Sequence, residues 1–138
     1  MSHPDGLPDL FIDRSLGRIE VPALLRNAGL RLVTLAEHYG IPADETVPDE
    51  QWLELAGTQG WAVLMKDTRI RYNPAEREAV KSHHVRCFCL SSQNLTGEAM
   101  ATRFLDNITR ITAACNEPGP FIYAVHKNRN EKLTLGDQ

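Results

Sequence analysis

The chain has 138 residues, of which 42% are hydrophobic and 24% charged, with a formal net charge of −3. These values favour one folded domain over a disordered chain, and the acidic balance argues against an extended basic groove for nucleic acid. The negative net charge does not exclude a small nucleic-acid site, because a metal ion bound to acidic residues would restore positive charge there.

No apolar stretch approaches the about 20 residues of a membrane helix, and the first residues lack the pattern of a secretory signal. The three cysteines are an odd number. We therefore expect a reduced, cytoplasmic protein with no membrane span.

Residues 1–6 are polar and contain Pro and Gly, so we expect a flexible N-terminus. Apolar spacing, caps and turn residues then predict the following elements in order: a strand (7–13), a helix (19–28), a strand (30–36), a loop (40–48), a helix (49–58), a strand (61–66), a helix (74–83), a strand (85–90), the longest helix (96–115) and a strand (120–125). Residues 127–138 predict a polar tail, which leaves 7–126 as the domain.

Strands alternate with helices along this whole domain. Such alternation is typical of an α/β fold in which helices cover both faces of a mostly parallel sheet, here with five strands.

Three aspartates lie where predicted elements begin or end. Asp13 and Asp67 each close an apolar strand, and Asp49 opens a helix. Ligands of open α/β sheets bind beyond the carboxyl ends of the strands, and carboxylates gathered there form an oxygen-only site for a hard cation such as Mg²⁺. Asp49 alone could equally be an ordinary helix-start residue, because an acid there complements the helix dipole.

Three segments resemble those of a known family. They are Phe11-Ile12-Asp13-Arg14, the predicted helix segment 49–56, which begins with an acidic residue, and the apolar strand that ends in Lys66-Asp67. In order and spacing they resemble PIN domains, and among them the compact domains related to VapC ribonuclease toxins. The resemblance covers about residues 8–126. It implies a three-layer sandwich in which the first strand is central and lies beside the strand that ends at Asp67.

The resemblance also implies a function. It implies an endoribonuclease that depends on Mg²⁺ or Mn²⁺, with Asp13, Asp49 and Asp67 as catalytic metal ligands, acting as the toxin of a toxin–antitoxin pair. The partners would then be RNA and a cognate antitoxin, with a homodimer as one option for the oligomeric state.

One acid of the larger PIN domains has no clear counterpart in this sequence. Those domains place a further acid, usually Glu, on a helix between the first two strands. Glu20 is the acid in that region, and Glu37 and Glu50 are the alternatives.

Basic residues flank the aspartates. Arg14 follows Asp13, and Lys66 and Arg69 lie on either side of Asp67. They could hold substrate phosphates, or they could form salt bridges with the acids in the metal-free protein.

Two other functions compete with a nuclease. A PIN-like domain that has lost catalysis would serve as a binding module, which the missing acid favours. A haloacid-type phosphatase would need an aspartate two residues after its nucleophile, where Ser15 stands, so the sequence argues against it.

Overall fold

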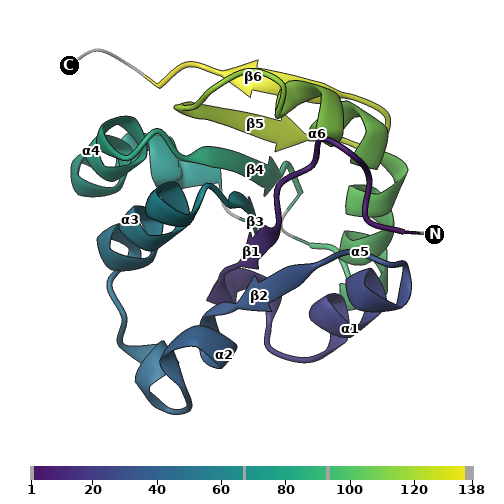
Figure 1. Ribbon diagram of the computed structural model, residues 1–138, viewed down its shortest axis with the longest axis horizontal. Helices are drawn as coiled ribbons and strands as arrows, with labels where there is room; N and C mark the ends of the chain where they lie inside the picture. Colours follow the sequence, from purple (N-terminus) through teal and green to yellow (C-terminus); the bar gives the residue numbers. More distant parts are fainter. Residues whose placement is uncertain (1, 67, 93, 136–138) are drawn as a thin grey trace.

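The computed structural model describes residues 2–66, 68–92 and 94–135, apart from the side chain of Arg69, and shows a six-stranded sheet between helices (Figure 1). The strands are β1 (Leu10–Ile12), β2 (Leu32–Thr34), β3 (Ala62–Met65), β4 (Arg86–Leu90), β5 (Phe121–Val125) and β6 (Asn130–Leu133). The α-helices are α1 (Glu20–Asn27), α2 (Leu35–Tyr39), α3 (Asp49–Gln59), α4 (Pro74–Ser82), α5 (Gly97–Asp106) and α6 (Ile108–Ala114). The short 3₁₀ helices are η1 (Arg14–Leu16), η2 (Ala43–Glu45) and η3 (Thr68–Tyr72).

The strands lie in the order β2-β1-β3-β4-β5-β6, and all neighbours are parallel except β5 and β6. This confirms the mostly parallel α/β sheet and the place of the first strand beside β3. The sheet has one strand more than the sequence predicts, because part of the expected polar tail pairs with β5 as an antiparallel strand.

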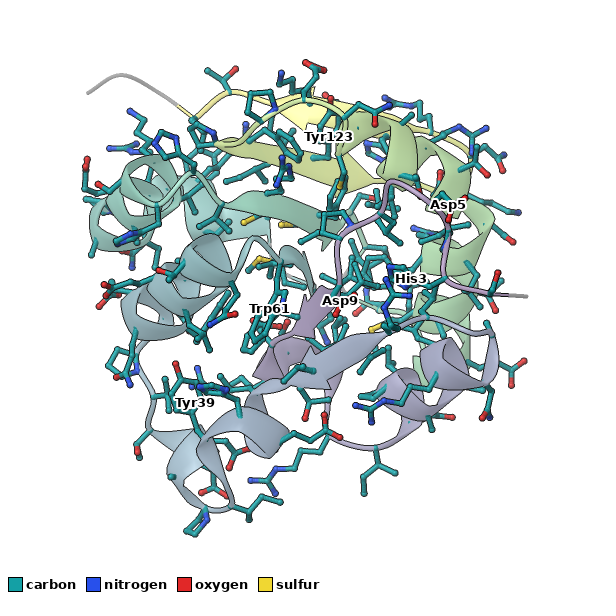
Figure 2. The ribbon with its side chains drawn as sticks, viewed as in Figure 1. His3, Asp5, Asp9, Tyr39, Trp61 and Tyr123 are labelled. Atoms are coloured by element: carbon teal, nitrogen blue, oxygen red, sulfur yellow. The ribbon has the colours of Figure 1, made fainter. Side chains whose placement is uncertain are left out.

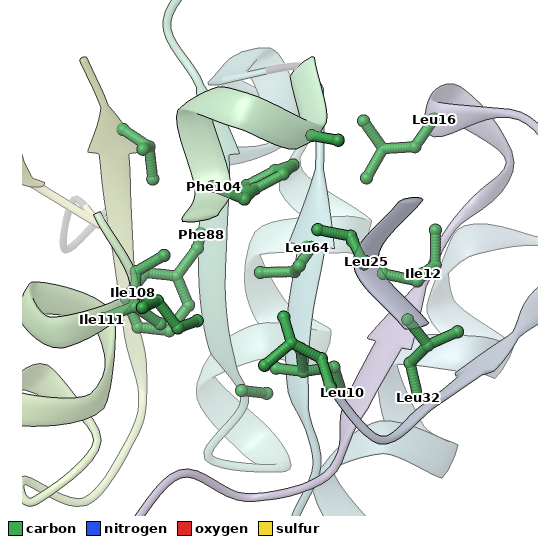
Figure 3. Close-up of a cluster of buried hydrophobic side chains, with 14 of the residues drawn as sticks. Leu10, Ile12, Leu16, Leu25, Leu32, Leu64, Phe88, Phe104, Ile108 and Ile111 are labelled. Carbon is green, nitrogen blue, oxygen red and sulfur yellow. The ribbon is translucent and has the colours of Figure 1, made fainter. Parts of the chain in front are cut away.

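Helices cover both faces of the sheet, as the sequence predicts. Alternate strand residues point to opposite faces: Leu10 and Ile12 pack in one apolar cluster with α1, α5 and α6, whereas Phe11 packs in the other with α3 and α4. Figure 3 shows the first cluster, where Leu25 of α1 and Phe104 of α5 meet the sheet. Four apolar residues of the helix expected at 96–115, Met100, Phe104, Ile108 and Ile111, thus belong to the core.

Two predicted elements differ from the structure in extent. The expected strand at 30–36 is shorter, because Thr34 ends β2 and at once caps α2. The Thr34 side chain accepts a hydrogen bond from the Glu37 N–H, and the Glu37 carboxylate accepts one from the Thr34 N–H, each at 3.0 Å. This reciprocal pair is a capping box, which starts a helix where the apolar pattern alone predicts more strand.

The expected helix at 96–115 is divided into α5 and α6 at Asn107. This side chain is fully buried, and its amide donates to the carbonyls of Arg103 and His126 at 2.9 Å and of Lys127 at 3.3 Å. The break therefore ties the helices to the turn between β5 and β6.

His3 attaches the N-terminal segment to the residues that precede β1 and β2, and Figure 2 labels it close to Asp9, the residue before β1. The Arg31 N–H donates to His3 Nδ1 at 2.9 Å, so Nε2 of the neutral ring carries the proton and donates to the Leu7 carbonyl at 2.9 Å. These bonds join residue 3 to Leu7 and Arg31, and the flexibility of residues 1–6 stays a prediction.

Across the described ranges, none of the helices is long and apolar enough to cross a membrane.

Candidate active site

Asp13 lies directly after β1, at the carboxyl edge of the sheet. Its carboxylate oxygen Oδ1 accepts two hydrogen bonds from Ser15, from the backbone N–H at 3.1 Å and from the hydroxyl at 2.5 Å. The same hydroxyl oxygen accepts a bond from the Lys66 N–H at 3.0 Å. Ser15 therefore joins the ends of β1 and β3 and fixes the orientation of the Asp13 side chain.

Asp13 is only 6% exposed, and this burial dominates the electrostatics of its carboxyl group. Burial raises the pKa of Asp13 to about 6, the two bonds from Ser15 lower it, and the nearby charges of Asp49 and Arg14 raise and lower it, respectively. Desolvation thus exceeds the stabilisation that the neighbours supply, so the ionised carboxylate would gain from a cation in contact with it.

Asp49 faces the same region from the first turn of α3. Its Oδ1 accepts hydrogen bonds from the Trp52 indole N–H at 2.9 Å and from the Arg14 guanidinium at 3.1 Å. Arg14 also donates to the carbonyls of Asp44 at 3.0 Å and Val47 at 2.5 Å. The guanidinium therefore connects the residue after Asp13 to the loop that precedes Asp49.

A second arginine holds the same loop. Arg18 donates two bonds to the carboxylate of Asp44, both at 2.9 Å, and one to Glu45 at 3.1 Å. Asp44 is buried, and the hydrogen bond from Arg18 lowers the pKa of its carboxyl group. Together the two arginines position the start of α3 against the end of β1.

Asp13 and Asp49 share a pocket of about 410 Å³. The pocket is lined by Asp13, Arg14, Ser15, Asp49, Met65, Ile70, Asn73 and Glu76. The structure thus brings together two of the three predicted aspartates and one of the predicted basic residues.

Glu76 is a pocket residue that the sequence analysis does not predict. It lies in the first turn of α4, whose N-cap Asn73 accepts hydrogen bonds from the backbone N–H groups of Ala75 and Glu76. The sequence does hold a signal for it, since Asn73-Pro74 marks a helix start close after β3 and places an acid there, as Asp49 does at the start of α3.

The other predicted ligands lie elsewhere or are not described. Asp67 is outside the described residues, and so is the side chain of Arg69. Lys66 is half-buried, with its backbone N–H bonded to Ser15. Among the residues that the structure describes, no three Asp, Glu, His or Cys side chains form a group that could hold a metal ion.

The three alternative acids do not line the pocket. A Glu20 carboxyl oxygen packs against Gly97 at the start of α5, only 2.1 Å from where a Cβ on that glycine would be. Glu37 caps α2 and pairs with Arg26 at 2.7 Å. Glu50 is exposed on α3. Glu37 thus caps α2, and Glu20 lies in the first turn of α1 against the start of α5.

The chain is similar to known proteins over most of its length. A family model described as "PIN like domain" matches residues 8–92. A Mycobacterium tuberculosis (strain ATCC 25618 / H37Rv) protein, named "Putative ribonuclease VapC45", is 41% identical over 123 residues, which cover 89% of each chain. No solved structure matches the chain.

Proposed function

The chain belongs to the PIN-like domain family, and from this premise we propose that it is a metal-dependent endoribonuclease that acts as the toxin of a toxin–antitoxin pair. The observation that carries the proposal is the pocket that joins buried Asp13 to Asp49 at the carboxyl ends of β1 and β3. The ribonuclease name of the mycobacterial relative supports RNA as the substrate.

The residues of the pocket fit a hard divalent cation. All its acidic donors are carboxylate oxygens, which Mg²⁺ and Mn²⁺ prefer, and Asp13 is buried with a raised pKa. We propose that Asp13 and Asp49 hold the cation, with Asp67 as a third ligand and Glu76 as the further acid that the sequence lacks at Glu20.

The proposed reaction is hydrolysis of a phosphodiester. Water adds to phosphorus, one P–O ester bond breaks, and the products carry a phosphate and a hydroxyl group. A divalent cation would supply neutralisation of the phosphate charge and a more acidic water. The chain itself would orient Asp13 through Ser15 and Asp49 through Arg14, and Lys66 and Arg69 would be the candidate contacts to substrate phosphates.

The expected setting follows from the same family. A ribonuclease that cleaves cellular RNA requires an inhibitor, so we propose a cognate antitoxin as partner and the cytoplasm as location. The pocket suggests where such a partner would act, because a delivered arginine could bind the carboxylates bidentately in place of the cation.

The decisive test compares two acid substitutions. Asp13→Asn should lower the rate of RNA cleavage in Mn²⁺ by more than the roughly 10- to 100-fold that loss of an outer-shell partner costs. Glu20→Gln, at an acid that lies against Gly97, should leave cleavage intact. Both rates would be measured on purified protein with a labelled single-stranded RNA.

The alternative of an inactive binding module makes the opposite prediction. A wild-type protein that binds no Mn²⁺ in calorimetry and cleaves no RNA would favour that alternative. Equal cleavage by wild type and a folded Asp13→Asn variant would instead exclude this pocket as the active site.

A further inference from the structure

Tyr72 is an exposed aromatic residue that directly precedes the pocket residue Asn73 in the chain. η3 runs from Thr68 to Tyr72, and both Ile70 within it and Asn73 after it line the pocket. Tyr72 lies between these two residues and is 65% exposed. Residues three apart share one face of a 3₁₀ helix, as Ile70 and Asn73 do, so the Tyr72 side chain leaves the turn from an adjacent face, with its backbone about 4 Å along the turn from Ile70.

The Tyr72 ring is supported from one side by a cation. The guanidinium carbon of Arg71 lies 4.5 Å from the ring centroid, which is a cation–π contact. The Nε atom of Arg71 is buried and has no hydrogen-bond partner among the described residues. Arg71 also lies near enough to Glu131 to contribute to the lowered pKa of that carboxyl group. The guanidinium thus covers one side of the ring, while the residue as a whole remains 65% exposed.

A flat, exposed ring that neighbours, along the chain, a pocket proposed to hold a phosphodiester is suited to stack on a nucleobase. Aromatic side chains stack on the unpaired bases of single-stranded nucleic acid, and the contact is tolerant of sequence because every base has a π face. The other large exposed apolar residues of the described chain, Ile19 and Ile41, line a separate groove and have no aromatic face.

We propose that Tyr72, backed by Arg71, is a stacking platform for one base of single-stranded RNA next to the phosphodiester in the carboxylate pocket. The proposal rests on the proposed ribonuclease function. It adds a residue that selects unpaired RNA over duplex, because a base within a duplex cannot reach the ring without leaving its stack.

The test measures binding and cleavage separately. Tyr72→Ala should raise KM for a single-stranded RNA of about 12 nucleotides, and weaken its binding, roughly 5- to 100-fold, the range of one lost base stack, with kcat nearly unchanged. Tyr72→Phe should restore binding, whereas Tyr72→Leu, which keeps apolar bulk, should not. Ile41→Ala, which truncates an equally exposed side chain in the other groove, is the matched control. Binding would be followed by fluorescence anisotropy in the Asp13→Asn background, where the RNA should stay intact.

An abasic nucleotide placed at each position in turn separates stacking from other effects. At one position beside the cleaved bond, removal of the base should weaken binding to wild type but have no further effect on Tyr72→Ala, since the two changes remove the same contact. The stacking proposal would be overturned if the losses of affinity from the abasic nucleotide and from Tyr72→Ala were additive at every position, or if Tyr72→Ala kept the wild-type KM. Cleavage by the wild type would in either case still support the nuclease function. If Tyr72→Ala bound RNA as the wild type does but no longer co-purified with a protein that the wild type retains, Tyr72 would instead be assigned to contact with a protein partner. A wild type that neither binds nor cleaves RNA would refute both proposals.

Discussion

Asp13 is held in a position that costs the metal-free protein stability. Its ordinary pKa of 3.8 rises to about 6 in the folded chain, so folding favours the protonated form. Below pH 4 both folded and unfolded states bind the proton and no penalty exists. As the pH rises through 6 the folded state must bury a charge, and the full penalty is present at neutral pH.

Asp13→Asn should therefore stabilise the metal-free protein at pH 7.5 by up to about 3 kcal/mol, from a shift of about two pKa units at 1.36 kcal/mol each. The amide oxygen can still accept the bonds from Ser15. The gain should shrink to a small fraction near pH 4 and vanish below it. Urea unfolding of both proteins in EDTA at the two pH values measures this, and a gain that does not depend on pH would show that burial of the Asp13 charge is not its cause.

The sequence predicts Asp13 and Asp49 as neighbours because strand ends and helix starts meet at the carboxyl edge of a parallel sheet. The pair Asn73-Pro74 signals a helix start with an acid in its first turn, but not that Glu76 faces the pocket, since the direction of that helix depends on how η3 turns the chain after β3. The sequence does not decide whether Arg14 contacts a substrate phosphate or forms a salt bridge with one of the acids. The structure shows the salt bridge to Asp49, and a phosphate contact stays a prediction.

Asn107 shows how one polar side chain can decide the course of a helix. Its apolar neighbours continue the helical spacing, so the pattern predicts one long helix. The break follows from three carbonyls that the Asn107 amide satisfies, and two of them belong to a turn about 20 residues later in the chain. No local pattern contains that information.

Asn107→Ala should destabilise the protein by about 1–3 kcal/mol, because it removes, from a fully buried position, the donor to three part-buried carbonyls. The β5–β6 turn should loosen first, with faster amide exchange in β6. Asn116→Ala, at an exposed asparagine after α6, is the control and should change the unfolding midpoint little. Equal unfolding midpoints for the two variants would contradict a bridging role for Asn107.

Short-range signals account for other differences between sequence and structure. The capping box of Thr34 and Glu37 is present in the sequence and could have predicted the start of α2. β6 could not be predicted in the same way. Its Glu131 and Lys132 are exposed, so it lacks the apolar alternation of a strand and exists because β5 offers an open edge.

Metal binding should stabilise the molecule as a whole if the pocket holds the cation. A cation at about 100 times its Kd adds about 2.7 kcal/mol. For a chain of 138 residues this corresponds to a rise in Tm of roughly 10 °C. Mn²⁺ should raise the Tm of wild type and of Glu20→Gln but not of Asp13→Asn, as scanning calorimetry would show. The same rise in all three proteins would mean that the ion binds elsewhere.

The two outer strands of the sheet have a consequence for behaviour at high concentration. β2 has three residues and β6 has four, of which Glu131 and Lys132 are charged and exposed. An outer strand can pair with another chain through its row of unpaired backbone N–H and C=O groups. A short strand has few such groups, and exposed charges disfavour the pairing. We expect the sheet to resist growth into fibrils, so precipitates of this protein should lack the 4.7 Å spacing of cross-β diffraction.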